Sequence, residues 1–168
     1  MKVKFGLYKK IKTMKKILFP TDFSSAAENA FLNALALAKK MDASVTLLHV
    51  YQLPELGRSL KTTTKEVYEI MEMEELEAFK KSVKKLRDLA EEKNYEGIDL
   101  DHIMAEGETV YQITKIAKKI AADYIVLGTT GATGLKEIFL GSVASGVIDE
   151  SSVKVISVPE KNGLSPNH

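Results

Sequence analysis

Residues 16–24 read KILFPTDFS, and they join a short apolar run to a polar loop. The run Lys16–Phe19 has β character, and Pro20 closes it because proline cannot donate a hydrogen bond to a strand ladder. A run this apolar is typical of a strand covered on both faces. The stretch therefore predicts a buried strand whose carboxyl end carries a polar loop that includes Asp22.

Four further runs with β character follow, separated by helical patterns. They are Val45–Val50, Ile98–Met104, Asp123–Leu127 and Val153–Val158. Strands that alternate with helices pair in parallel through right-handed crossovers. The sequence therefore predicts a single α/β domain, an open three-layer sandwich with a five-stranded parallel sheet and helices on both faces.

Apolar residues that recur every three or four positions mark the helices between these runs. Capping boxes are predicted at Ser25–Glu28 and Thr109–Gln112, each with a hydroxyl and a second polar side chain three residues later. The first helix is expected to bury Ala27, Ala30, Phe31, Ala34, Leu35 and Ala38. The second would bury Val110, Ile113, Ala117 and Ile120. A long polar segment, residues 61–94, would bury Leu76, Phe79, Val83, Leu86 and Ala90.

Composition excludes several classes of function. The net charge is +1, from 24 basic and 23 acidic residues, which gives no electrostatic case for a nucleic-acid or membrane partner. The chain has no cysteine, so a disulfide scaffold, a thiolate metal site and a cysteine nucleophile are excluded. This absence fits a reducing cytoplasm. No apolar run approaches the roughly 20 residues that span a bilayer.

The 168 residues are the size of one domain, which we expect to cover residues 14–160. Residues 1–13 are rich in lysine with scattered apolar residues, and we expect them to form a poorly ordered extension, with a functional basic arm as the alternative. Residues 161–168 are expected to form a loose tail.

Two glycine–hydroxyl elements predict an anion site. Residues 128–134 read GTTGATG, and nine residues separate Gly131 from the pair Gly141-Ser142, which precedes a short amphipathic helix. Glycine lets backbone amides approach an anion closely, and the first amides of a helix are unpaired and positively polarised. That these glycines only form tight turns remains the alternative, because neither GxGxxG nor a lysine-containing phosphate loop occurs.

Asp22 has two possible roles at the end of the first run. In open α/β sheets ligands bind at the carboxyl ends of strands, where a carboxylate can accept hydrogen bonds from ribose hydroxyls. The same side chain could instead cap the helix that follows. The two roles compete for the same oxygens but do not exclude each other.

From Met14 to Pro159 the chain resembles the universal stress protein family. The resemblance rests on KKILFPTDFS, SVTLLHVY, IAKKIAADYIVLGTTG, GLKEIFLGSVASGVI and VKVISVP, in the family's order. The pattern G-x2-G-x9-G-[ST], here Gly128 to Ser142, marks ATP-binding members of the family. The resemblance implies the Rossmann-like fold of the adenine nucleotide alpha hydrolase type, with sheet order 3-2-1-4-5.

The resemblance also implies a site for ATP, or for AMP or ADP, with Mg²⁺ or Mn²⁺ held through the phosphates. The residues so implied are Pro20, Thr21, Asp22, Val50, Gly128, Gly131, Gly141, Ser142 and Val143. It further implies a homodimer through the strand Val153–Val158. Ala144 departs from the family, which often has Ser or Thr there, and residues 53–65 match no family pattern.

These features favour a dimeric, cytoplasmic, nucleotide-binding regulator of the stress response over an enzyme. No lysine or arginine can be placed in the phosphate loops, and no carboxylate pair has an evident general-acid role. His49 lies in an apolar run and is predicted to be a hydrogen-bonded core residue, so no catalytic residue is assigned. A slow or autophosphorylating ATPase and a nucleotide-free dimeric interaction module remain the alternatives.

Overall fold

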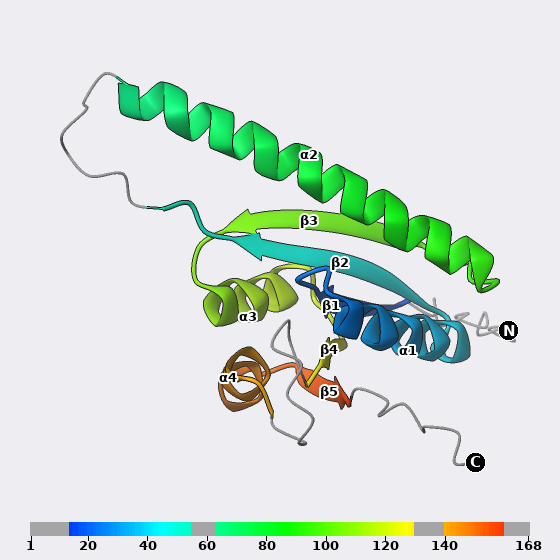
Figure 1. The fold of residues 1–168 in the computed structure, drawn as a ribbon. Coiled ribbons are helices and arrows are strands. Elements are labelled where there is room, and N and C mark those ends of the chain that lie inside the picture. Colours follow the sequence, from blue (N-terminus) through cyan, green and yellow to red (C-terminus); the bar gives the residue numbers. More distant parts are fainter. Residues whose placement is uncertain (1–13, 55–62, 130–139, 160–168) are drawn as a thin grey trace, which may run out of the picture.

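A computed structural model describes residues 14–54, 63–129 and 140–159, and its centre is a five-stranded parallel sheet (Figure 1). The strand order is β3-β2-β1-β4-β5, which confirms the predicted fold class and order. The strands are β1 (Lys15–Pro20), β2 (Ala43–Tyr51), β3 (Leu100–Glu106), β4 (Tyr124–Gly128) and β5 (Lys154–Val158).

The third strand lies two residues further along the chain than predicted. In register with β2 it runs from Leu100, opposite Val45, to Glu106, opposite Tyr51. Ile98, the predicted first residue, instead donates its N–H to the carbonyl of Tyr95 in the turn that precedes the strand. The boundaries of the other strands differ from the prediction by one or two residues.

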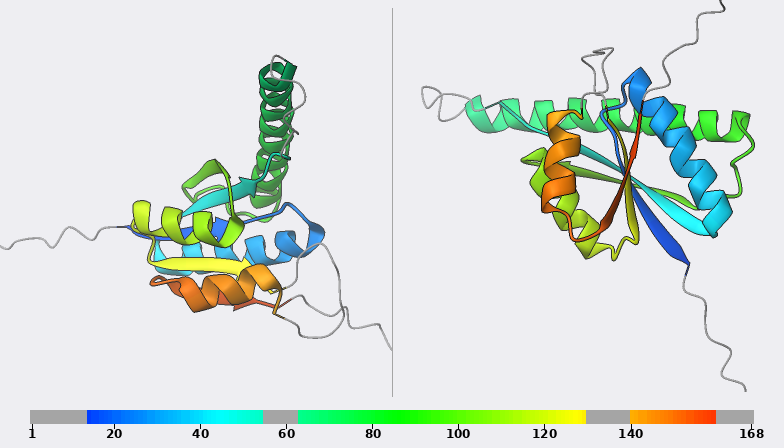
Figure 2. Two further views of the ribbon diagram at one scale, coloured as in Figure 1. Left: turned by 90° about the vertical axis from the view of Figure 1, so that its left-hand side faces the viewer. Right: turned by 90° about the horizontal axis from the view of Figure 1, so that it is seen from below.

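Two helices cover each face of the sheet, which makes the three layers (Figure 2). α1 (Ser25–Met41) and α2 (Thr63–Glu92) pack on one face, and α3 (Thr109–Lys119) and α4 (Ser142–Glu150) pack on the other. α1 buries all six residues of its predicted stripe. Because four of these six are alanines, α1 can approach the central strands closely.

The long helix α2 extends beyond the sheet at its amino-terminal end (Figure 1). Phe79, Val83, Leu86 and Ala90 are buried as predicted, at 5% exposed or less. Leu76 was expected to belong to the same stripe, but it is 38% exposed. Leu76 lies towards the part of α2 that extends past the strand ends, so periodicity alone overestimated the buried face.

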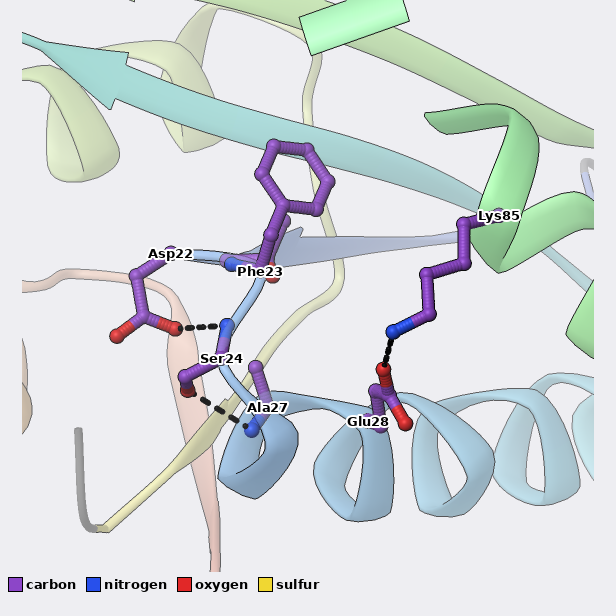
Figure 3. Close-up of polar contacts among 7 residues, drawn as sticks. Asp22, Phe23, Ser24, Ala27, Glu28 and Lys85 are labelled. Carbon is purple, nitrogen blue, oxygen red and sulfur yellow. Dashed lines mark hydrogen bonds and ion pairs between the residues drawn. The ribbon is translucent and has the colours of Figure 1, made fainter. Parts of the chain in front are cut away.

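The predicted capping boxes are both wrong by one residue. At α1 the N-cap is Ser24, and its hydroxyl accepts a hydrogen bond from the N–H of Ala27 at 3.3 Å (Figure 3). The carboxylate of Glu28, which the box had assigned to capping, pairs with Lys85 of α2 and ties the two helices together.

At α3 the N-cap is Glu108 and not Thr109. Its carboxylate accepts hydrogen bonds from the N–H groups of Tyr111 at 2.6 Å and Val110 at 3.0 Å. These two bonds, the one from Tyr111 most of all, lower the pKa of Glu108. A charged carboxylate is a stronger acceptor than a hydroxyl, which explains the shift of the cap by one residue. Gln112 donates instead to the carbonyl of Glu106 at 2.7 Å.

Within the described residues, no helix is both long enough and apolar enough to span a membrane. The expected amino-terminal extension, residues 1–13, and the expected tail, residues 161–168, lie outside the described residues.

The cap at Ser24 predicts unequal effects at two adjacent serines. Ser24→Ala removes the hydroxyl that accepts from Ala27 and should lower the free energy of unfolding by about 1 kcal/mol. Ser25→Ala is the matched control, because the Ser25 side chain is exposed in the first turn and alanine favours a helix. Urea unfolding measures both variants. Equal losses, or a larger loss for Ser25→Ala, would contradict this assignment of the cap.

Candidate functional site

A cleft of about 370 Å³ lies at the carboxyl ends of the strands. Its lining comes from β1, β2 and β4, from the residues just after β1 and β4, from α1 and α3, and from the start of α4. Eight of the sequence-predicted residues line it, namely Pro20, Thr21, Asp22, Val50, Gly128, Gly141, Ser142 and Val143. The ninth, Gly131, lies outside the described residues, as do Thr130 and Thr133.

The cleft opens because β1 ends before its neighbour β2. Pro20 is in register with Leu48, the N–H of Thr21 still bonds to the Leu48 carbonyl at 2.9 Å, and β2 continues to Tyr51. In a parallel ladder, alternate residues direct their backbone N–H and C=O to the same neighbouring strand. Val50 therefore directs its polar backbone groups to the same side as Leu48, where β1 no longer runs. They face the cleft and are available to a ligand.

The loop after β1 holds Asp22 in a turn with one carboxylate oxygen engaged. The Oδ1 atom of Asp22 accepts from the N–H of Ser24 at 3.0 Å (Figure 3). The hydroxyl of Thr21 accepts from the N–H of Phe23 at 3.0 Å. Among the described residues Oδ2 has no hydrogen-bond donor, and the Asp22 side chain is exposed. Asp22 therefore does not cap α1, whose N-cap is Ser24. It stabilises the turn before the helix with one oxygen, and its ribose-binding role stays a prediction for the other.

The start of α4 adds backbone amides to the lining of the cleft. Its N-cap, Gly141, has no side chain that could cap the helix, and the first intrahelical bond is that of Ser145 to Gly141 at 2.9 Å. The N–H groups of Ser142, Val143 and Ala144 therefore lack partners within the described part of the chain. They form the positive end of the helix dipole and favour an anion.

Two other amides of the predicted cradle are already bonded to the protein. The N–H of Gly141 donates to the carbonyl of Thr129 at 2.8 Å, and the N–H of Thr129 donates to Val158 at 3.1 Å. A Cβ atom at position 141 would lie 3.2 Å from the Thr129 oxygen. Gly141 thus allows a close approach between the end of β4 and α4, and the amides that remain for an anion are those of residues 142–144.

The cleft has three chemically distinct parts. It offers a carboxylate at Asp22, an apolar wall that includes Val50 and Ile113, and amide donors at the start of α4. Its described lining contains no lysine, arginine or histidine. This arrangement suits a ligand with hydroxyl groups, an apolar ring and an anionic group.

Sequence analysis missed the contribution of α3. Thr109 and Ile113 line the cleft, although Thr109 was predicted only to cap a helix and Ile113 only to pack in the core. Their position depends on how α3 packs beside α4, and no motif reports that. Leu48, Leu127 and Ala27 also line the cleft and were predicted only as strand or core residues.

Fold and cleft together define a parallel α/β domain with a cleft at the carboxyl edge of its sheet. The model of the universal stress protein family matches residues 13–159. Universal stress protein MJ0531 of Methanocaldococcus jannaschii is 39% identical over 150 residues, which cover 88% of this chain and 84% of the relative. Universal stress protein MJ0577 of the same organism is 33% identical over 156 residues, which cover 88% and 96%. This chain belongs to the universal stress protein family.

Solved structures agree with this assignment. The structure of MJ0577 matches with a TM-score of 0.67 and 34% identity, covering 88% of this chain and 97% of that one. A universal stress protein of Archaeoglobus fulgidus, solved in complex with dAMP, matches with a TM-score of 0.58 and covers 86% and 96% of the two chains. At 21% identity this second match shows likeness of fold.

We predict that adding a single methyl group destabilises the protein at Gly141 but not at Gly97. Gly141→Ala should lower the free energy of unfolding by about 1 kcal/mol, because the new Cβ crowds the Thr129 carbonyl and alanine is a poor N-cap. The control is Gly97→Ala, where an added Cβ has nothing within 4 Å. Urea unfolding of the two variants measures the difference. A Gly97→Ala variant that is destabilised as much as Gly141→Ala would show that the close approach is unimportant.

Proposed function

We propose that this protein binds an adenine nucleotide, ATP in the first place, in the cleft at the carboxyl edge of its sheet. The observation that carries the proposal is that one cleft is lined both by Asp22, which has one oxygen without a donor among the described residues, and by the uncapped amides of α4. A nucleotide has a ribose for the first and phosphates for the second. A universal stress protein from Archaeoglobus fulgidus with the same fold has been solved with dAMP, which supports this ligand class.

In the proposed complex each part of the nucleotide meets a matching part of the cleft. The ribose hydroxyls donate to Oδ2 of Asp22, beside Gly128. The adenine ring lies against Pro20 and Thr21 and bonds to the backbone groups of Val50 that β1 leaves unpaired.

The phosphates accept from the amides of Ser142 and Val143 and from the Ser142 hydroxyl, with Gly131 and Gly141 shaping the loop. Within the described ranges no group of three His, Asp or Glu side chains is placed to hold a metal ion. A Mg²⁺ or Mn²⁺ ion would therefore accompany the nucleotide through its phosphates, where it neutralises their charge.

We further propose that the bound nucleotide regulates a cytoplasmic stress response and is not a substrate for rapid turnover. Phosphoryl transfer needs cations that neutralise the developing charge and a group that orients the nucleophile. The described lining of the cleft supplies neither a lysine nor an arginine, and His49 bonds to the carbonyl of Thr21. Slow hydrolysis or autophosphorylation remains the second candidate, and an interaction module without nucleotide is the third.

Nucleotide binding is tested by thermal unfolding with and without ATP and Mg²⁺. ATP at 100 times its Kd should stabilise the protein by about 2.7 kcal/mol, seen as a Tm higher by several degrees. Asp22→Asn should weaken binding about tenfold or more while preserving the fold, because the asparagine Oδ1 can still accept from Ser24.

Mass spectrometry of nucleotide released from the purified protein identifies the natural ligand. An unchanged Tm at millimolar ATP and Mg²⁺, with no nucleotide released, would favour the interaction module. Steady phosphate release from the wild type that Asp22→Asn abolishes would favour the ATPase.

We also propose that β5 pairs with its counterpart in a second copy of the chain. Among the described strands β5 pairs only with β4, so its other edge is open. Its residues Val155 and Ile156 are only half-buried, and Val143 and Ile148 of the adjacent α4 are 41% and 42% exposed. An open edge with apolar neighbours is a site for strand pairing.

The dimer proposal predicts that one proline will separate the two copies. The Val158 carbonyl accepts from Thr129, the residue after β4, so by alternation the N–H of Ser157 points to the open edge. Ser157→Pro removes that donor and should give a monomer by light scattering, with the β4–β5 ladder intact. Ser157→Ala keeps the amide and should remain dimeric. A monomeric wild type, or a dimeric Ser157→Pro variant, would overturn the proposed interface.

A further inference from the structure

His49 of β2 bonds to the loop that carries Asp22. Its ring Nδ1 lies 3.0 Å from the carbonyl oxygen of Thr21, 28 positions away in the sequence. A carbonyl oxygen only accepts hydrogen bonds, so Nδ1 must carry the proton. The bond therefore holds the peptide group that joins Thr21 to Asp22.

The face of the same ring packs against the residue on the other side of Asp22. The ring centroids of His49 and Phe23 are 5.0 Å apart. Phe79 of α2 completes the cluster, 6.1 Å from His49 and 6.0 Å from Phe23. Phe79 is 5% exposed, whereas Phe23 and His49 are half-buried, and together the three rings join the loop, β2 and α2.

Phe23 needs this contact because its backbone is strained. Its φ of 58° lies in the left-handed region, which residues with a side chain rarely adopt because it is strained. The packing of its ring against the other aromatic rings offsets that strain. The left-handed residue reverses the chain after Asp22 and lets Ser24 donate to Oδ1 of Asp22.

We propose that His49 is a positioning residue for nucleotide binding, which acts through Asp22. It holds the residue before Asp22 by a hydrogen bond and the residue after it by ring packing, so Oδ2 stays directed to the cleft. The inference rests on the proposed function, because the group it positions is the one assigned to the ribose. If His49 only stabilised the core, replacing it would not selectively weaken the contact with the ribose hydroxyls.

Two substitutions of His49 separate the contribution of its hydrogen bond from the contribution of its ring packing. His49→Phe keeps an aromatic ring against Phe23 and Phe79 but loses the donor to Thr21. His49→Asn loses the ring but retains an N–H donor near the position of Nδ1. Calorimetry compares ATP with 2′,3′-dideoxy-ATP, which lacks the two ribose hydroxyls, for the wild type and each variant.

We expect a loss of affinity only for the nucleotide that carries the ribose hydroxyls. His49→Phe should weaken ATP binding about fivefold to tenfold, the effect of one lost hydrogen bond, and dideoxy-ATP binding less than twofold. His49→Asn should recover part of the affinity for ATP. The double variant Asp22→Asn/His49→Phe should bind ATP no more weakly than Asp22→Asn alone, since the positioned oxygen is already gone. Equal weakening of both nucleotides, or of neither, would overturn the inference.

Amide hydrogen exchange without ligand provides an independent measurement. If His49 holds the turn, His49→Phe should speed exchange at Phe23 and Ser24, whose amides donate within it, and leave the ladder between β1 and β2 protected. Unchanged exchange at these two amides would refute the positioning role. A wild type that binds no adenine nucleotide would refute the proposed function instead, with the exchange experiment still deciding whether His49 holds the turn.

Discussion

The end of the central strand β1 is the constraint on which the rest of the molecule depends. β1 is buried between helices on both faces, so its backbone groups must be paired. It is in register with β2 up to Pro20 and with β4 at Ile17 and Leu18. Beyond Pro20 the chain turns away through the left-handed Phe23 into α1, while β2 continues to Tyr51. This stagger creates the cleft, frees the backbone of Val50 and brings Asp22 to its rim.

Most of the fold could be predicted from the sequence, and the errors have local causes. Nearly continuous apolar runs identified β1, β2 and β4, and the alanine-rich stripe of α1 was correct at every position. The order of the strands came from a family resemblance, since periodicity reports no pairing. Both helix caps were assigned one residue too late, because Ser24 and Glu108 compete with neighbours of similar capping ability. Leu76 was misassigned because spacing along a helix does not show where the sheet ends.

Some residues of the candidate site could be predicted from local sequence patterns, whereas others are placed there only by the packing of distant segments. Asp22 and the Gly141-Ser142 pair were predicted because strand ends and glycine–hydroxyl elements have a recognisable composition, whereas Val50 came from the family resemblance. The fold gathers all four residues in one cleft. Thr109 and Ile113 reach the cleft only through the packing of α3. His49 is hydrogen-bonded, as expected, but it is half-buried and its partner Thr21 lies in another segment. Contacts between segments far apart in the sequence are the part that a single sequence does not reveal.

Because all five strands run in one direction, the sheet has two different ends, which we call rims. The carboxyl ends of the strands lie at one rim and their amino ends at the other. Everything assigned to ligand binding lies on one rim, whereas the chain enters β1 at Lys15 on the other, about 20 Å away along the strand. A fluorophore or affinity tag joined ahead of Lys15 therefore starts at the far rim from the ligand entrance. One joined after Pro159 starts on the entrance rim, where the side chain of Asn29 donates to the Pro159 carbonyl. Biosensor measurements on this protein should immobilise it through its amino-terminal side.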